Sequence, residues 1–321
     1  MVLLKRDFNK YFFIFPCMFF IPLLICFRSD DFRDYQNYYN YFKYGYEGVE
    51  VSYKIISTLL RSVDNGFYYL LYLYGFLGFS LKFYRFYEIY AINYGFFRFL
   101  LVLSMYFCCF FVLWDLIQIR YSAAISFLMI GFFCKNIKFK FFLFFISFLF
   151  HYSMVVPICL FIFLVYFKNN FTRFLFFILF PIFGYFLIGY SEYALRYSSV
   201  SSDYDQSIPI FSGIYFLNFF MIIVFIFFKD KVSENYREIS LDIFWASLIL
   251  MVLCMVISPV TPEGANRYIS LLTFQLLMLF SLIKNRLFSY LYFVFVVFFC
   301  FWYLKIYIWK EDGLIPFNGL F

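Results

Sequence analysis

The stretch "FFLFFISFLFHYSMVVPICLFIFLVYF", residues 141–167, carries no Lys, Arg, Asp or Glu and holds the only histidine of the 321-residue chain, His151. A membrane crossing takes about 20 apolar residues, so the stretch is longer than one crossing and too short for two. An ionisable side chain within such a run is costly and is functional by default. The placement of this stretch therefore decides both the topology and the site.

The composition predicts an integral membrane protein. Hydrophobic residues make up 65% of the chain and aromatic residues 29%, more than a soluble domain can bury. The sequence predicts an all-α, polytopic protein with one transmembrane domain over residues 1–321 and about 10–11 transmembrane segments, including 141–167. The apolar blocks are 11–27, 66–83, 97–113, 119–134, 141–167, 174–190, 210–228, 241–258, 268–283 and 287–306. The first is expected to be a retained helix, since no small-residue cleavage site follows it.

The distribution of charge predicts the orientation. We take a cytoplasmic N-terminus and let the 141–167 block enter and leave on the same side. Sixteen of the 26 basic residues then lie at cytoplasmic ends: Lys5, Arg6, Lys10, Lys82, Arg85, Arg98, Lys135, Lys138, Lys140, Lys168, Arg173, Lys229, Lys231, Arg237, Lys284 and Arg286. Only six of the 19 acidic residues join them. This excess of positive charge is what the positive-inside rule expects, and it places loops 28–65 and 191–209 on the far side of the membrane.

A single crossing by 141–167 would reverse every later loop and turn the basic clusters outward. The block is therefore expected to be two half-length helices that meet near the middle of the membrane, with their apex in "FHYSMVVP", residues 150–157. Pro157 would lie early in the second half, where a missing backbone donor costs least. Broken helices are tolerated at membrane depth only inside protein or beside a watery cavity, so His151 is expected at the floor of a polar cavity.

Three arginines on the predicted outer side are candidates for binding a phosphate or diphosphate. They are Arg120 in "WDLIQIRYSAA", Arg196 in "SEYALRYSSVSSDYDQ" and Arg267 in "SPVTPEGANRYISLL". Bidentate geometry favours Arg over Lys for phosphate. The alternative is simple salt bridging, with Glu192 for Arg196 and with Asp115 or Glu263 for the other two.

Carboxylates and the histidine complete the predicted site. The loop 28–65 mixes acidic residues with many tyrosines and asparagines, which suits sugar binding but is also typical of an interfacial aromatic belt. His151 can act as base, acid or donor to an oxyanion, or it can be a hydrogen-bonded structural residue. The "DYD" at 203–205 resembles a metal-nucleotide motif but lies on the side without nucleotide sugars, and no metal or other cofactor is expected.

Five short pieces in order resemble the EpsG-like group of O-antigen and exopolysaccharide polymerases, often called Wzy. They are "RDYQNYYNYF", "EVSY", "IRYSAAISFLMIG", "FHYSMVVPICLF" and "NRYISLL". The resemblance covers nearly the whole chain. In this family the glutamate of the outer loop is often followed by Pro, whereas Val51 follows Glu50 here. Either Glu50 or Glu47 can therefore correspond to the glutamate of the family.

The resemblance implies an enzyme of the bacterial inner membrane that moves a growing glycan from undecaprenyl diphosphate onto the next lipid-linked repeat at the periplasmic face. It implies Asp34, Glu50 and His151 as catalytic residues. It also implies Arg120 and Arg267 as ligands of the diphosphate. Arg196 is added to them because it is an arginine on the same predicted side. The partners are then the lipid-linked oligosaccharide and membrane lipid. A chain-length regulator protein is a partner that the sequence leaves open, and the net charge of +7 is not taken as a sign of nucleic-acid binding.

Two other classes fit parts of the pattern. A lipid-glycan flippase or transporter also uses broken helices with polar residues at mid-membrane, but the chain has no detectable repeat and its unusual polar residues gather on one face. A membrane acyltransferase that modifies sugars would carry a paired Arg and His near the first helix, which this sequence lacks.

Overall fold

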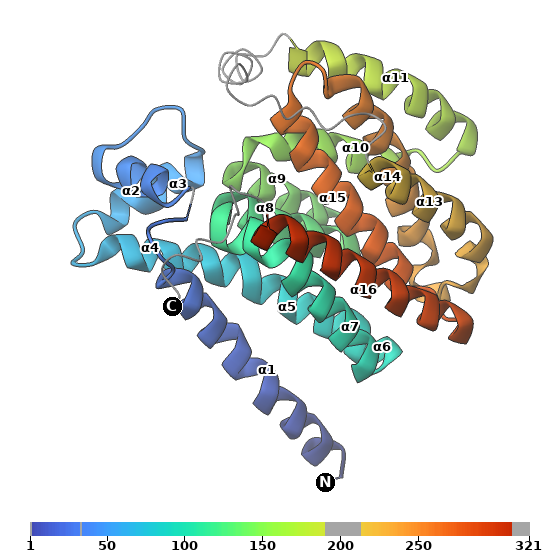
Figure 1. Cartoon of the computed structure of the whole chain (residues 1–321), viewed down its shortest axis with the longest axis horizontal. Helices are drawn as coiled ribbons and strands as arrows, with labels where there is room; N and C mark the ends of the chain where they lie inside the picture. The colour runs from blue at the N-terminus through green and yellow to red at the C-terminus, as the bar shows by residue number, and fades with distance from the viewer. Residues whose placement is uncertain (1, 33, 190–212, 310–321) are drawn as a thin grey trace. The chain divides into compact units, whose positions relative to one another are not determined.

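The computed structural model describes residues 2–32, 34–189 and 213–309. Within these ranges the chain is helical throughout, and its only β feature is an isolated bridge between Val232 and Ile283 (Figure 1). This confirms the predicted all-α class. Contacts divide the chain into two compact units, residues 1–155 with 293–321 and residues 156–292. The prediction of a single transmembrane domain stays a prediction.

The first unit holds the helices that build the candidate site. Its elements are α1 (Val2–Cys26), α2 (Tyr35–Tyr44), α3 (Val51–Leu60), α4 (Gly66–Gly75), η1 (Phe76–Ser80), α5 (Leu81–Phe86), η2 (Tyr87–Ala91), α6 (Ile92–Tyr94), α7 (Phe96–Tyr106), η3 (Phe107–Ile117), α8 (Ile119–Phe133), α9 (Ile137–Phe150) and η4 (Tyr152–Met154). The elements η1, η2 and η3 are π-helical, and η4 is a 3₁₀ turn. The predicted loop 28–65 therefore contains two short helices, α2 and α3.

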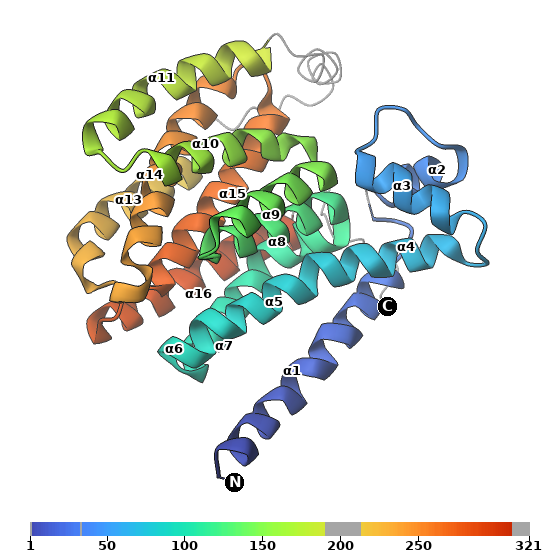
Figure 2. The ribbon, with the colours of Figure 1, turned by 180° about the vertical axis from the view of Figure 1, so that it is seen from behind.

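Packing within the first unit brings distant segments together. Helix α8 packs against α4, η1, α5 and α9, and α3 packs against both α4 and α9. Figures 1 and 2 show α2 and α3 beside α4, with the C-terminal end of α1 meeting the same helix. As a result, the start of α3, the start of α8 and the end of α9 share one region.

The second unit holds α10 (Val155–Tyr166), α11 (Asn170–Gly189), α13 (Gly213–Phe228), η5 (Lys229–Lys231), α14 (Glu234–Ile257) and α15 (Pro262–Ser281). Helix α16 (Arg286–Trp309) begins in this unit and continues into the first. Here α14 packs against α11, α13 and α15.

The predicted break in 141–167 is present. Helix α9 is capped by Asn136, whose side chain accepts hydrogen bonds from the backbone N–H groups of Lys138 and Phe139. It ends at His151, where φ is −157° and the backbone is extended, and η4 follows before α10 begins. Pro157 is the third residue of α10, where its missing N–H interrupts no helical hydrogen bond. Whether α10 returns to the side from which α9 came stays a prediction.

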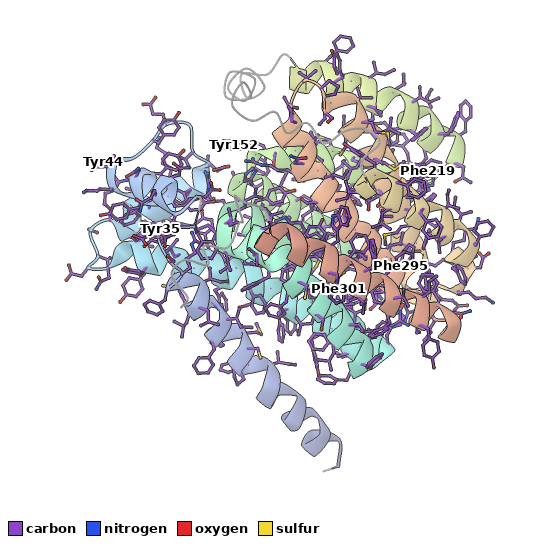
Figure 3. The ribbon with its side chains drawn as sticks, in the orientation of Figure 1. Tyr35, Tyr44, Tyr152, Phe219, Phe295 and Phe301 are labelled. Carbon is purple, nitrogen blue, oxygen red and sulfur yellow. The ribbon has the colours of Figure 1, made fainter. Side chains whose placement is uncertain are left out.

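The helices have the length and surface of membrane segments. Three stretches are long and apolar enough to cross a membrane, Phe96–Ile117, Gly213–Lys231 and Glu234–Ile257, and six shorter apolar helices accompany them in the described ranges. Large aromatic side chains lie on the outside, including Phe219 at 47% and Phe301 at 71% exposure (Figure 3). Apolar surface of this kind requires lipid around it, as a polytopic membrane protein provides.

One assumption of the charge count is wrong. The count places Lys82 at a cytoplasmic helix end, but Lys82 and Asp115 are both buried in the first unit and their Nζ and Oδ1 atoms lie 3.4 Å apart. Lys82 also donates to Ser122 Oγ at 2.5 Å, and Asp115 accepts from Tyr106 and Ser122. Gly78 permits this close packing, since a Cβ there would lie 2.5 Å from Ser122 Oγ. Lys82 therefore does not count as an exposed charge in the orientation argument.

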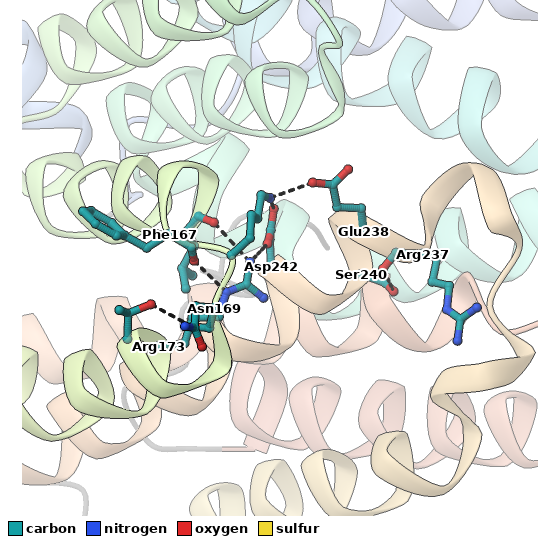
Figure 4. A network of polar contacts seen from close by, with 10 residues as sticks. Phe167, Asn169, Arg173, Arg237, Glu238, Ser240 and Asp242 are labelled. Atoms are coloured by element: carbon teal, nitrogen blue, oxygen red, sulfur yellow. Dashed lines mark hydrogen bonds and ion pairs between the residues drawn. The ribbon is translucent and has the colours of Figure 1, made fainter.

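A second buried ion pair fixes the second unit internally. Arg173 Nη2 donates to Asp242 Oδ1 at 2.5 Å and to the Leu164 carbonyl at 3.2 Å, and its Nε donates to the Phe167 carbonyl (Figure 4). Lys168 joins the network from a more exposed position. The network ties the α10–α11 connection to α14 and does not touch the candidate site residues described below.

Candidate functional site

Glu50, Arg120 and His151 meet although they come from three separate segments of the chain. Arg120 Nη1 forms an ion pair with Glu50 Oε2, and His151 Nε2 lies 3.6 Å from Glu50 Oε1. The Glu50, Arg120 and His151 side chains are 8%, 18% and 9% exposed. The sequence predicted all three as site residues, and the structure brings them together. We call these three residues the acidic cluster.

Glu50 is held by the start of α3. It occupies the N-cap position, where its backbone carbonyl accepts from Lys54 N at 3.1 Å, while its side chain makes no capping bond. The carboxylate is therefore available to Arg120, and it also lies at the positive end of the helix. Glu47, the alternative in the sequence, is exposed. The structure favours Glu50.

Arg120 lies among three tyrosine rings that the sequence did not assign. Its Cζ is 5.2 Å from the centroid of Tyr38, 5.5 Å from Tyr53 and 5.8 Å from Tyr41. Each such contact stabilises a guanidinium by about 0.5–2 kcal/mol. Tyr53 donates its hydroxyl proton to the backbone carbonyl of Tyr38 at 2.6 Å, which fixes the Tyr53 ring against α2. The signal was present in the sequence, because Tyr38 and Tyr41 are three residues apart and share one face of α2.

The tyrosines act as neutral rings. Burial raises the pKa of Tyr38 to about 12, and the positive charge of Arg120 opposes this only in part. Burial also raises the pKa of Tyr53. Both therefore keep their phenol protons at physiological pH and add no negative charge. Glu50 is the carboxylate that neutralises Arg120.

The end of α9 sets the proton position on His151. Its Nδ1 accepts from the backbone N–H of Ser153 at 3.3 Å and lies 2.7 Å from Ser153 Oγ. A backbone N–H can only donate, so Nδ1 carries no proton, and the neutral ring holds its proton on Nε2. That Nε2–H faces Glu50. Tyr121 contacts the imidazole edge to face, with centroids 5.2 Å apart.

The other predicted site residues lie elsewhere or outside the described residues. Asp34 is the N-cap residue of α2, and its charge acts on Arg28 and Tyr38. Arg267 lies on α15 in the second unit, where its backbone carbonyl accepts from Ser270, and its role at the diphosphate stays a prediction. Arg196 and the "DYD" at 203–205 lie outside the described residues.

The acidic cluster can perform proton transfer and charge stabilisation. It offers one carboxylate that can accept a proton, one imidazole N–H that can donate a hydrogen bond, and one guanidinium with a partly exposed side chain. Of the predicted salt-bridge partners of Arg120, Asp115 is engaged by Lys82 instead. Among the described residues, no group of three or more His, Cys, Asp and Glu side chains is placed to hold a metal ion.

The fold and the acidic cluster define a polytopic all-α membrane protein with a polar site beside a tyrosine-rich segment. The chain belongs to the EpsG family, whose family model matches residues 10–318. No curated protein and no solved structure gives a significant match to the chain. The family assignment supports a general role as a membrane polysaccharide polymerase.

Proposed function

We propose that the protein is a glycosyltransferase of the bacterial inner membrane that polymerises lipid-linked repeats at the periplasmic face. The donor is a growing glycan on undecaprenyl diphosphate, and the acceptor is the terminal sugar of the next lipid-linked repeat. The bond to the diphosphate is already activated, so the reaction requires no nucleotide.

The observation that carries the proposal is the meeting of Glu50, Arg120 and His151. They lie at the start of α3, the start of α8 and the break after α9. The meeting of one ion pair and one imidazole from three such segments at two carboxylate oxygens is typical of a functional site and supports the proposal. A salt bridge alone would account for Arg120 but not for the ring of His151 beside the same carboxylate.

The reaction is a displacement at the anomeric carbon of the donor sugar. The hydroxyl oxygen of the acceptor forms the new bond, its proton passes to Glu50, and the bond from the anomeric carbon to the diphosphate oxygen breaks. The electron pair of that bond leaves with the lipid diphosphate. Arg120 holds the Glu50 carboxylate in place through the ion pair, and His151 Nε2 lies beside the same carboxylate. Arg267 and Arg196 are proposed to stabilise the leaving diphosphate.

The test is a reaction with purified components. Purified protein is mixed with a synthetic undecaprenyl-diphosphate-linked repeat, and the products are separated on a gel. A ladder of lengths that Glu50→Gln abolishes supports the proposal, while an intact substrate with wild-type protein contradicts it.

The alternatives give different results in a deletion strain. Loss of a polymerase leaves single-repeat glycans on the surface. Loss of a flippase leaves no surface glycan, and loss of an acyltransferase leaves full-length chains that lack the modification.

A further inference from the structure

Arg28, the first residue after the predicted first membrane helix, is buried and forms no ion pair with another described residue. The residue is 8% exposed. Its Nε, Nη1 and Nη2 atoms are all buried and have no hydrogen-bond partner among the described residues. Arg28 also forms no ion pair with any residue in the described ranges, although Asp34 acts on its charge from nearby and Asp30 is two residues away.

Two other largely buried arginines in the described ranges, Arg120 and Arg173, do have counter-charges. Arg120 is paired with Glu50, and Arg173 with Asp242 and two backbone carbonyls. Among the described residues, the rings of Tyr35 and Tyr38 lie near the Arg28 guanidinium, with centroids 5.7 and 5.8 Å from its Cζ. Ring contacts recover a small part of the cost of removing a guanidinium from water. Burial accordingly lowers the pKa of Arg28, with Tyr38, Tyr35 and Asp34 opposing the shift.

A cavity of about 420 Å³ lies at this residue. Its walls include Arg28, Asp30, Tyr35, Gln36, Tyr39 and Tyr68 (Tyr35 is labelled in Figure 3). Tyrosine rings can stack on the faces of a sugar, and the carboxylate and amide can bind its hydroxyl groups. A guanidinium beside such walls suits a phosphate attached to the sugar.

Arg28 and Arg120 share one neighbouring ring, that of Tyr38. Arg28 and Arg120 both lie over Tyr38, at 5.8 and 5.2 Å from its centroid. Glu50 neutralises Arg120, whereas no described carboxylate pairs with Arg28. Of these two neighbouring guanidinium groups, Arg28 is therefore the one whose charge is left for a ligand.

We propose that Arg28 and this cavity bind the sugar-diphosphate end of a glycan substrate, with the guanidinium on the phosphate and the tyrosines on the sugar. The anion site follows from the buried charge and the cavity, and only the naming of a lipid-linked glycan as ligand rests on the proposed function. Because the guanidinium nitrogens are covered, the ring of Tyr35 or Tyr38 has to move when the phosphate enters.

Binding to the full-length protein in phosphatidylcholine nanodiscs tests the site without any turnover. The probe is farnesyl-diphosphate-linked N-acetylglucosamine, and inorganic pyrophosphate is the soluble competitor. We expect Arg28→Gln to raise the Kd of the probe at least tenfold and pyrophosphate to displace the probe from wild type. The matched control is Arg61→Gln, which changes an exposed arginine of the same loop whose Nε donates to the Phe42 carbonyl. An unchanged Kd in Arg28→Gln overturns the proposal.

A separate arm tests whether a lipid headgroup is the true ligand. The same titration is made in nanodiscs that contain phosphatidylglycerol. Unchanged probe affinity supports the glycan substrate. If phosphatidylglycerol excludes the probe from wild type and Arg28→Gln removes this effect, the site binds a phospholipid headgroup and the glycan assignment is overturned.

The thermal stability of the ligand-free protein gives a readout that separates ligand binding from a structural role. Removing an uncompensated buried charge should keep or raise the melting temperature, so we expect Arg28→Gln without ligand to be at least as stable as wild type. If Arg28→Gln instead fails to fold, probe binding is measured with Arg28→Lys. A folded Arg28→Lys protein with weakened probe binding supports the site, and one with wild-type binding overturns it.

Failure of this site and failure of the proposed function are distinguishable. Probe binding that depends on Arg28 in a protein without polymerase activity would retain the anion site and remove the polymerase proposal. If Arg28→Gln instead makes a glycan ladder with wild-type rate and wild-type substrate affinity, the polymerase proposal is retained and the Arg28 site is removed.

Discussion

Nε2 of His151 lies 3.6 Å from Oε1 of Glu50, at the point where α9 ends. The two residues meet because the helix stops there and the Ser153 backbone orients the imidazole. The break is thus what gives the only histidine its place beside a carboxylate. The first three predictions concern this region.

Replacing Glu50 by Gln removes the proton acceptor and keeps the size of the side chain. We expect glycan synthesis to fall by about 10² to 10⁴, the usual contribution of a general base. The rate of ladder formation by purified protein is the measurement. Glu47→Gln is the matched control, because Glu47 is exposed three residues away and should keep wild-type activity. Equal activity of both variants would remove Glu50 from the mechanism.

Replacing His151 by Asn tests the imidazole separately from the helix break. The Asn side-chain oxygen can accept from Ser153 N as Nδ1 does, but Asn places no donor where Nε2–H faces Glu50. Loss of the imidazole removes the proton-exchanging group next to Glu50, so we expect the rate to fall by about 10² at normal protein level. A protein that is poorly folded but active per molecule would instead show a structural histidine.

The ion pair between Arg120 and Glu50 predicts strong coupling in a double-mutant cycle. Each single change, Arg120→Gln or Glu50→Gln, leaves one charge buried without its partner, at a cost of about 3–5 kcal/mol in the free energy of unfolding. The double variant should lose clearly less than the sum of the two single variants. Thermal unfolding in detergent measures all four proteins. Simple additivity would mean that the two side chains do not interact.

Cysteine labelling tests the prediction that 141–167 enters and leaves on the cytoplasmic side. Asn136 and Asn169 are poor labelling positions, because their side chains accept backbone hydrogen bonds at helix starts. Lys135→Cys and Asn170→Cys, both at exposed positions, are better, in a background without the eight native cysteines. We expect both to react only with a reagent admitted to the cytoplasm, and Glu47→Cys to react from outside. Opposite accessibility of the first two would contradict the topology.

In the second unit, Arg173 and Lys168 both bind the carboxylate of Asp242. We expect their replacement to destabilise the protein to different extents. The Arg173 side chain is 4% exposed and the Lys168 side chain 42%. Arg173→Gln should destabilise the protein by about 3–5 kcal/mol, whereas Lys168→Gln should cost only about 0–1 kcal/mol. Melting temperatures of the two variants provide the comparison, and similar values would show that burial does not set the strength of this network.

The fold class and the helix break were predictable because they depend on patterns along the chain. Apolar length indicates membrane helices, and an uncharged run of unsuitable length with a histidine and a proline indicates a break. The π-helical elements η1, η2 and η3 were not predictable, since their backbone geometry follows from tertiary packing such as that of Gly78 against Ser122.

The site was predicted in its members but not in its pairing. Glu50, Arg120 and His151 drew attention as unusual polar residues, yet their partners depend on which helices pack together. Asp115 is five residues from Arg120 and was the natural partner by sequence, but it pairs with Lys82. Arg28 was missed because, in the sequence, it is only one more charge at a membrane boundary. Its burial becomes visible only once α2 covers it with tyrosine rings.

The Lys82–Asp115 pair has a consequence for how the chain enters the membrane. Lys82 lies on α5 and Asp115 on η3, so each helix inserted alone would expose a charge to hydrocarbon, at about 2.5–3.5 kcal/mol on the translocon scale. The two segments are joined only through the short turn at Gly95, whose φ is +95°. Residues 66–117 are therefore suited to leave the translocon as one helical hairpin, with the charges matched before lipid reaches them.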